Sequence, residues 1–463
     1  IYIRQNITLK NSLITVAIAH PLLPMLNTIT NIKSPNILII ALATRKYRGV
    51  VLSPRALSVL DKKLYPYVKI RPKNIIQVKD NVQDTINSLK QLKEKGIDVV
   101  DLTVGQPDFF TPDNVKNAAK KAVDDNYSFY SPVPGYKDLI QAVVKKFKNE
   151  NNLDYAENQI VVSTGAKQSL ANVMQCLFEK GDEIIIPTPY WVTYIELAHL
   201  CNATPVIISS DASTGYKITA EQLQAAITPK TKGFILNSPS NPSGSVYSKE
   251  ELKALADVLA KNPEIAIISD EIYEHLNYEL HHESIAQFDN VKNQTIVING
   301  VSKAYAMTGW RIGYLAAPAD VAAACRKLQG QTTSGTCSVA QRAALEALVG
   351  SQDCIAKNNE ILKQRRDVMA KNLKAIPNVK FNVPPATFYC FPDFSAYYGK
   401  KFNGKTISNS ADFCDYLLNE AHVATVAGGA FGIDECIRMS YVVGIDRIEE
   451  AFKRINKALE NLK

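Results

Sequence analysis

The amino-acid sequence predicts an α/β protein, with a large domain built on a mostly parallel seven-stranded sheet flanked by helices and a smaller α+β domain. Three observations predict it. Short β-branched runs alternate with helical stretches from about residue 97, as in a parallel sheet covered on both faces. After about residue 338 this rhythm gives way to a long polar helix near 352–375 and then to shorter elements. The chain of 463 residues is also too long for one small core.

Seven segments predict the strands of the large sheet. Each is short, rich in residues that favour extended backbone, and bounded by polar or turn-forming residues. Helices are expected between several of them, for example at 219–228 and 248–261. The predicted strands are 159–164, 183–189, 204–210, 232–239, 266–271, 295–300 and 310–318.

The same patterns divide the chain into four predicted parts. The first part has no clear periodicity and no acidic residue before Asp61, which fits a targeting segment or an unstructured extension. The second part contains its own helix near 80–95 and is expected to join the small domain. The parts are an N-terminal extension (1–62), a segment contributing to the small domain (63–105), the large domain (106–345) and the small C-terminal domain (346–463).

Charge and cysteine usage exclude several classes of protein. The net charge is +8, but seven basic residues precede Asp61, so the remainder is nearly neutral and no nucleic-acid partner is expected. The eight cysteines are scattered, with no CxxC pair and no histidine cluster at metal-ligand spacing, which predicts no metal site and a reducing compartment. No apolar run is long enough for a membrane span. We therefore expect a cytoplasmic protein, or an organellar one if residues 1–62 act as a transit peptide.

Polar residues follow several predicted strands, at the edge where an open parallel sheet forms its ligand site. Residues 165–167 (Gly-Ala-Lys) open a helix whose free backbone amides could hold a phosphate, although a plain strand-to-helix turn would have the same sequence. Asn241 lies in the turn 237–244, which taken alone is an ordinary loop. Asp270 and Tyr273 follow another strand, where Asp270 could equally be a helix N-cap.

Lys303 is the strongest candidate for chemistry. It follows the strand 295–300, and its neighbour is Ser302, with Arg311 eight residues further on. Apolar, glycine-containing surroundings would lower its pKa and make its amine a nucleophile. A lysine taken at random is a solvated surface charge. The case for Lys303 therefore depends on its combination with the other strand-end residues.

In combination, these segments resemble the ordered motifs of class I aminotransferases, and most closely the beta subgroup of aspartate aminotransferases. The resemblance covers roughly residues 63–463. It implies fold type I, the cofactor pyridoxal 5′-phosphate (PLP), amino acids and 2-oxo acids as substrates, and a homodimer with shared active sites. The segments are VGQPDF, VVSTGAKQSL, PTPYWVTY, NSPSNPSG, SDEIYE, NGVSKAYAMTGWRIGY and IRMSY.

The resemblance also implies a role for each site residue. Lys303 would form the Schiff base with PLP and move the proton at the substrate Cα. Asp270 would pair with the ring nitrogen, while Tyr273 and Asn241 would bond the phenolic oxygen. Trp191 would stack on the ring. The implied phosphate contacts are Gly165, Ala166, Lys167, Ser302, Arg311 and, from the neighbouring subunit, Tyr130.

Substrate recognition is implied for a further group of residues. Arg438 would clamp the α-carboxylate, aided by Gly105, Trp191 and Asn241, although outside its motif Arg438 could form a surface salt bridge. Lys167 would face a distal carboxylate, because the loop 329–336 has no arginine for that task. The expected reaction converts aspartate and 2-oxoglutarate into oxaloacetate and glutamate, in a ping-pong cycle through the pyridoxamine form of the enzyme.

Two departures from the family pattern leave the substrate range open. Residues 334–336 read SGT where SNP is common, and 71–74 differ from the usual Ile-x-Pro-Ser form. Prephenate, an aromatic amino acid or alanine could therefore be the amino partner. A different class of function is a ligand-sensing domain fused to a DNA-binding module, but residues 1–62 lack the periodicity of a helix-turn-helix.

Overall fold

The computed structural model describes residues 2–9, 12–19 and 89–463, and the chain divides into two units, Ile1–Gln77 and Val78–Lys463. In the first unit, β1 (Tyr2–Leu9) and β2 (Ser12–Ala19) form an antiparallel hairpin within the predicted extension. The predicted segment 71–74 lies outside the described residues. Of the helix expected near 80–95, residues 89–94 are described and helical. The described residues include no helix that could cross a membrane.

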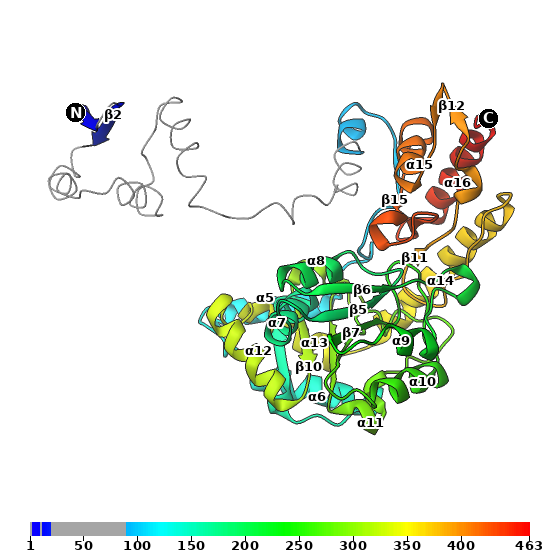
Figure 1. Cartoon of the computed structure of the whole chain (residues 1–463). Coiled ribbons are helices and arrows are strands. Elements are labelled where there is room, and N and C mark those ends of the chain that lie inside the picture. Colours follow the sequence, from blue (N-terminus) through cyan, green and yellow to red (C-terminus); the bar gives the residue numbers. More distant parts are fainter. Residues whose placement is uncertain (1, 10–11, 20–88) are drawn as a thin grey trace. The chain divides into compact units, whose positions relative to one another are not determined.

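The second unit is built on a seven-stranded sheet, which confirms all seven predicted strands (Figure 1). The strand order is β4-β10-β9-β8-β7-β5-β6. Only β10 runs antiparallel to its neighbours, so the sheet is mostly parallel, as expected. The strands are β4 (Ile160–Ser163), β5 (Glu183–Pro187), β6 (Thr204–Ile208), β7 (Thr231–Asn237), β8 (Ala266–Asp270), β9 (Thr295–Gly300) and β10 (Gly313–Ala316).

Helices cover both faces of this sheet because successive strand residues point to opposite sides. On β5, Ile184 and Ile186 pack in the core beneath α7, α8 and α12, whereas Ile185 packs against α9 and α10 on the other face. Helices α5, α6 and α13 complete that second face. The helices are α5 (Asp113–Asp124), α6 (Lys137–Asn151), α7 (Ala166–Leu177), α8 (Thr193–Leu200), α9 (Ala220–Ala226), α10 (Lys249–Leu259), α11 (Asp289–Lys292), α12 (Ala319–Thr332) and α13 (Ser338–Val349).

Local signals explain where several elements begin and end. Thr219 and Ser248 cap the predicted helices α9 and α10, each in a capping box. The strand predicted from residue 310 begins later, at Gly313, because 308–310 form a 3₁₀ turn and Arg311 has a left-handed backbone with φ 56°. Tight turns at strand ends therefore displace the predicted boundaries by a few residues.

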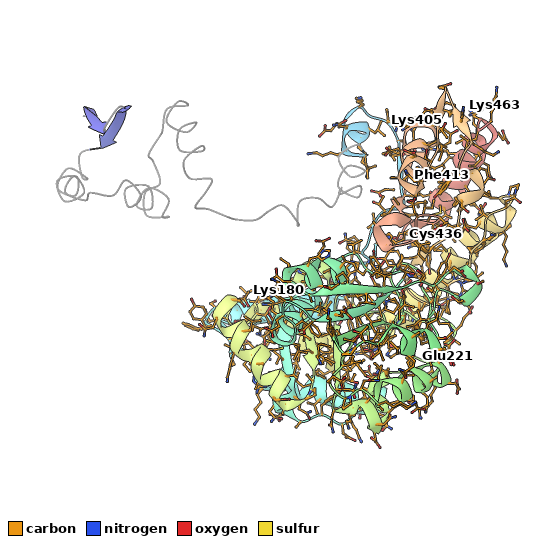
Figure 2. The ribbon with its side chains drawn as sticks, in the orientation of Figure 1. Lys180, Glu221, Lys405, Phe413, Cys436 and Lys463 are labelled. Atoms are coloured by element: carbon orange, nitrogen blue, oxygen red, sulfur yellow. The ribbon has the colours of Figure 1, made fainter. Side chains whose placement is uncertain are left out.

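The C-terminal part has its own core and small sheets. Helix α14 confirms the predicted long helix, and a three-stranded sheet runs in the order β11-β16-β15. Phe413 and Cys436 are buried here, whereas Lys463 lies on the surface (Figure 2). The elements are α14 (Asp353–Ala375), β11 (Tyr389–Cys390), β12 (Lys401–Phe402), β13 (Lys405–Thr406), α15 (Ser410–Tyr416), a π-helical turn (Leu417–Ala421), β14 (Val423–Ala424), β15 (Val426–Ala427), β16 (Ile437–Ser440) and α16 (Ile445–Glu460).

The segment before α5 is tied to this C-terminal part. Strand β3 (Val100–Asp101) pairs in parallel with β14, and Val100 and Leu102 join the core formed by α14 and α16. The loop that follows β3 therefore leads from the C-terminal part to the large sheet. The predicted boundaries at 105/106 and 345/346 stay predictions.

Candidate active site

A cavity of about 550 Å³ lies at the ends of the central strands, between the sheet and the C-terminal part. Eleven of the thirteen site residues expected from the sequence line it. Gly165 lies directly behind the lining, and Tyr130 lies outside it with an exposed fraction of 96%. The eleven are Gly105, Ala166, Lys167, Trp191, Asn241, Asp270, Tyr273, Ser302, Lys303, Arg311 and Arg438.

Lys303 follows β9 and projects into the cavity. Its Nζ donates a hydrogen bond to the carbonyl oxygen of Gly105 at 2.8 Å. Burial lowers the pKa of Lys303 to about 8, and the nearby Arg438 and Arg311 act in the same direction. A larger fraction of this amine is therefore uncharged near neutral pH than in an ordinary lysine.

Asp270 ends β8, the neighbour of β9, and its carboxylate is buried. The hydroxyl of Tyr194 donates to Oδ2 at 2.8 Å, and the backbone amide of Ile272 donates to Oδ1 at 3.3 Å. Asn237 braces the same strand ends: its amide donates to the Asp270 carbonyl, and its Oδ1 accepts from the Asn241 backbone amide. Burial raises the pKa of Asp270 to about 6 in spite of these bonds, so a cation beside it would be strongly favoured.

An anion-binding corner is formed where α7 begins. Gly165 is the N-cap of α7 with φ 83°, and no side chain caps the helix there. A β-carbon on Gly165 would overlap the guanidinium of Arg311, so glycine is needed for space as well as for conformation. Ser302 lines the same cavity. A helix N-terminus, a guanidinium and a hydroxyl together fit a phosphate group.

The charges of the cavity are strongly unbalanced. Lys167, Lys303, Arg311 and Arg438 all line it, and none of the four forms an ion pair within residues 89–463. Asp270 is the single carboxylate among the described residues that line it. Partial burial and the nearby Arg311 lower the pKa of Lys167, which shows that the cations interact with one another. The cavity is therefore suited to a ligand with several negative charges, such as a phosphate and two carboxylates.

Arg438 on β16 is held by aromatic rings rather than by an acid. Its guanidinium lies 4.5 Å from the ring centroid of Tyr389 and 5.0 Å from that of Phe431. It donates to Asn241 Oδ1 at 3.1 Å and to the Thr103 carbonyl at 2.9 Å, while its buried Nε has no partner within the described residues. Arg438 therefore forms no surface salt bridge with any residue that the structure describes. An arginine with a free donor in a cavity can bind a carboxylate.

Among the ten lining residues that were not expected from the sequence, three have side chains that hydrogen-bond to expected site residues. Asn237 stands at the end of β7, and Tyr194 lies three positions after Trp191, so a strand-end or helix-face argument could have found both. Tyr389 carries no such signal, since β11 reaches the cavity from the C-terminal part. The predicted contribution of Tyr130 to a neighbouring subunit stays a prediction.

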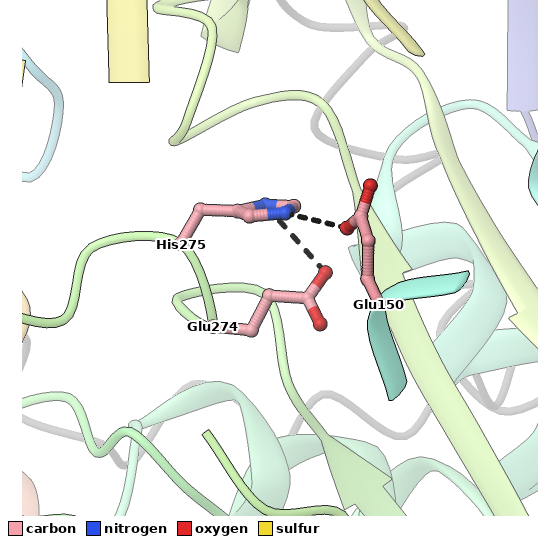
Figure 3. Close-up of side chains that lie close together, drawn as sticks. All are labelled: Glu150, Glu274 and His275. Atoms are coloured by element: carbon pink, nitrogen blue, oxygen red, sulfur yellow. Dashed lines mark hydrogen bonds and ion pairs between the residues drawn. The ribbon is translucent and has the colours of Figure 1, made fainter. Parts of the chain in front are cut away.

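Buried charges anchor the loop that follows β8. Glu274 accepts from Asn299 and contacts the ammonium of Lys146, and His275 lies between Glu274 and Glu150 (Figure 3). Burial alone would raise the pKa of Glu274, but Lys146 holds it well below its usual range. Because Lys146 already balances this carboxylate, we interpret the group as a structural support for the loop that carries Asp270 and Tyr273.

Comparison with known proteins agrees with this geometry. The model of the family "Aminotransferase class I and II" matches residues 97–455. A probable aspartate/prephenate aminotransferase of Rhizobium leguminosarum bv. phaseoli is 45% identical over 371 residues, which cover 80% of this chain and 93% of that protein.

Solved structures show the same fold. The crystal structure of the aspartate aminotransferase from Rhizobium meliloti has a TM-score of 0.81 at 42% identity and covers 84% of this chain and 98% of that chain. The aspartate aminotransferase of Thermus thermophilus with maleate has a TM-score of 0.78 at 34% identity and covers 84% and 98%. These matches confirm the predicted fold type I. The chain therefore belongs to the family of class I and II aminotransferases.

Proposed function

We propose that this protein is an aspartate aminotransferase, which moves the amino group of aspartate to 2-oxoglutarate and releases oxaloacetate and glutamate. The observation that carries the proposal is that, within residues 89–463, the cavity holds four cations without an ion pair around a single carboxylate. Arg311 is assigned to a phosphate and Lys303 to the chemistry, so Arg438 and Lys167 remain for two substrate carboxylates. The similar Thermus thermophilus enzyme was solved with maleate, which is a dicarboxylate.

Aminotransferases of this class use PLP, and the residues of the cavity fit it. The bound cofactor supplies an electrophilic carbon that takes up an amino group and a ring that accepts electrons. The backbone at Gly165–Lys167, together with Ser302 and Arg311, would hold its phosphate. Asp270 would hold a proton on the ring nitrogen, and Trp191 would cover the ring face.

The side-chain amide of Asn241 is oriented by its hydrogen bond with Arg438. Its Oδ1 already accepts a hydrogen bond from Arg438, so the amide NH₂ remains available as a donor. In our proposal this NH₂ and the Tyr273 hydroxyl donate to the phenolic oxygen of the cofactor. Lys303, with its pKa of about 8, would carry the proton to and from the substrate Cα.

The test of the function is a panel of half-reactions. The enzyme with bound PLP is mixed with single amino acids, and the change in visible absorbance of the cofactor is followed. Aspartate and glutamate should react at least about tenfold faster than alanine, because only they can engage both Arg438 and Lys167. Absence of reaction with both acids would refute the acidic preference.

Lys167 is predicted to set that preference. Replacing Lys167 by methionine should lower kcat/KM for aspartate by about 30- to 300-fold, since one partner of a carboxylate pair is lost, and should change alanine less than about threefold. Single-turnover rates with the two amino acids measure the difference. The exposed Lys180 provides a matched control, Lys180→Met, which should change neither. An equal loss for both amino acids would contradict the assignment.

Prephenate is the second candidate acceptor, because the relative from Rhizobium leguminosarum is named an aspartate/prephenate aminotransferase. Prephenate also carries two carboxylates, so the same cations would recognise it. The reverse half-reaction, with the amino form of the enzyme and oxaloacetate, 2-oxoglutarate or prephenate, distinguishes these acceptors.

We further infer a homodimer in which Tyr130 reaches the neighbouring subunit's active site. Tyr130, Phe129 and Phe110 are 96%, 82% and 90% exposed, and such aromatic side chains are typical of interface cores. A Tyr130→Ala variant loses one phosphate contact and should bind PLP more weakly. At limiting PLP, mixing it with the inactive Lys303→Ala variant should raise the activity above that of either component, because each mixed dimer then contains one complete site. A mixture no more active than its components would argue against shared sites.

A cytoplasmic location completes the proposal, with an organelle as the alternative if residues 1–62 are a transit peptide. All eight cysteines are free thiols, which supports a reducing compartment. Imaging the chain fused to a fluorescent protein, with and without residues 1–62, separates the two locations.

A further inference from the structure

Tyr389 touches two groups to which the proposed function gives separate tasks. Its side chain is 1% exposed and lines the cavity. Its hydroxyl lies 3.2 Å from the hydroxyl of Tyr273, and its ring lies 4.5 Å from the guanidinium of Arg438. Both contacts follow from position, since β11 pairs with β16, which carries Arg438, and faces the loop after β8.

The two hydroxyls impose a constraint on their protons. A phenol donates one hydrogen bond and accepts up to two. Within residues 89–463, Tyr273 is the only hydrogen-bond partner of the Tyr389 hydroxyl. If Tyr273 donates its single proton to the phenolic oxygen of the cofactor, the contact between the phenols is satisfied only when Tyr389 donates to Tyr273.

We propose that Tyr389 is a positioning residue with two separable tasks. Its hydroxyl donates to Tyr273 and so directs the proton of Tyr273 towards the cofactor, and its ring holds Arg438 in place for the substrate α-carboxylate. The proposal rests on the roles assigned above to Tyr273 and Arg438.

The direction of the hydrogen bond has a measurable consequence. A phenol that accepts a hydrogen bond is a stronger donor, so Tyr389 would help Tyr273 to stabilise an ionised phenolic oxygen. Loss of this donor disfavours the ionised form and raises the midpoint pH at which the bound cofactor changes its visible absorbance. If Tyr273 instead donated to Tyr389, loss of that competing acceptor would lower the midpoint.

Two variants of the full-length enzyme with bound PLP separate the tasks. Tyr389→Phe keeps the ring and removes the hydroxyl, and should raise the absorbance midpoint by about 0.5 to 1 pH unit while the Kd for maleate stays within about twofold. Tyr389→Leu removes both, and should also weaken maleate binding by about 5- to 20-fold, because the cation–π contact with Arg438 is lost.

Tyr416→Phe is the matched control. Tyr416 is a buried tyrosine of the C-terminal part whose hydroxyl donates to the Ala458 carbonyl, and it does not line the cavity. Tyr416→Phe should change neither the absorbance midpoint nor the Kd for maleate. An unchanged or lower absorbance midpoint in Tyr389→Phe would overturn the proposal that the Tyr389 hydroxyl directs the Tyr273 proton. Unchanged maleate binding in Tyr389→Leu would overturn the proposal that its ring holds Arg438. Neither measurement requires turnover, so failure of the aspartate reaction would be recognised separately.

Discussion

Replacing Lys303 by alanine is expected to abolish turnover, with a loss of about 10⁴-fold or more, while PLP still binds. One amine is assigned both the covalent attachment of the cofactor and the proton transfer at the substrate Cα, and general base catalysis alone contributes about 10²- to 10⁴-fold. The anion-binding corner at Gly165 and Arg311 remains intact in the variant, so PLP still binds noncovalently.

Two measurements check this expectation. Steady-state rates give the loss of activity, and mass spectrometry after borohydride reduction shows whether PLP is attached covalently to the chain. Lys303→Arg tests charge alone, because a guanidinium keeps the cation but offers no free amine near neutral pH. The exposed Lys180→Ala is the control. Normal activity in Lys303→Ala would end the assignment.

The second large effect is expected for Asp270→Asn, with kcat/KM lowered by about a thousandfold. The amide keeps the shape of the side chain but cannot balance a protonated ring nitrogen, and truncating one partner of a buried charge pair costs about 2–5 kcal/mol. At ~1.4 kcal/mol per factor of ten, the upper part of that range corresponds to this loss. If kcat/KM of Asp270→Asn were within tenfold of that of the natural enzyme, the assigned pairing of Asp270 with the ring nitrogen would be contradicted.

Asp270 also predicts a pH dependence of cofactor binding. Burial raises its pKa to about 6 in the protein without cofactor, so the carboxylate is ionised above that pH and protonated below it. Its contribution to PLP affinity should therefore be present above pH 6 and lost as the pH falls through 6. The PLP phosphate also titrates near pH ~6, so the difference between natural enzyme and Asp270→Asn isolates the carboxylate. Identical pH profiles for the two proteins would contradict the prediction.

Much of the fold was predictable because its signals are local. A strand buried on both faces requires a run of apolar residues, and all seven such runs became strands of the large sheet. The caps Thr219 and Ser248 likewise sit beside the helices that they start. The predicted ends of the strands were less accurate than the strands themselves. For example, β10 begins later than predicted because Arg311 has a left-handed backbone.

The sequence by itself determined the strands, the family and the polar residues at the strand ends, including Lys303 and Asp270. Only the tertiary structure decided which distant segments complete the cavity. Tyr389 arrives on β11, and the Tyr194 hydroxyl meets Asp270 from a separate helix. The shifted pKa values of Lys303 and Asp270 are decided in the same way. Burial and unbalanced charge are properties of a space enclosed by many segments, and no single stretch of sequence contains them.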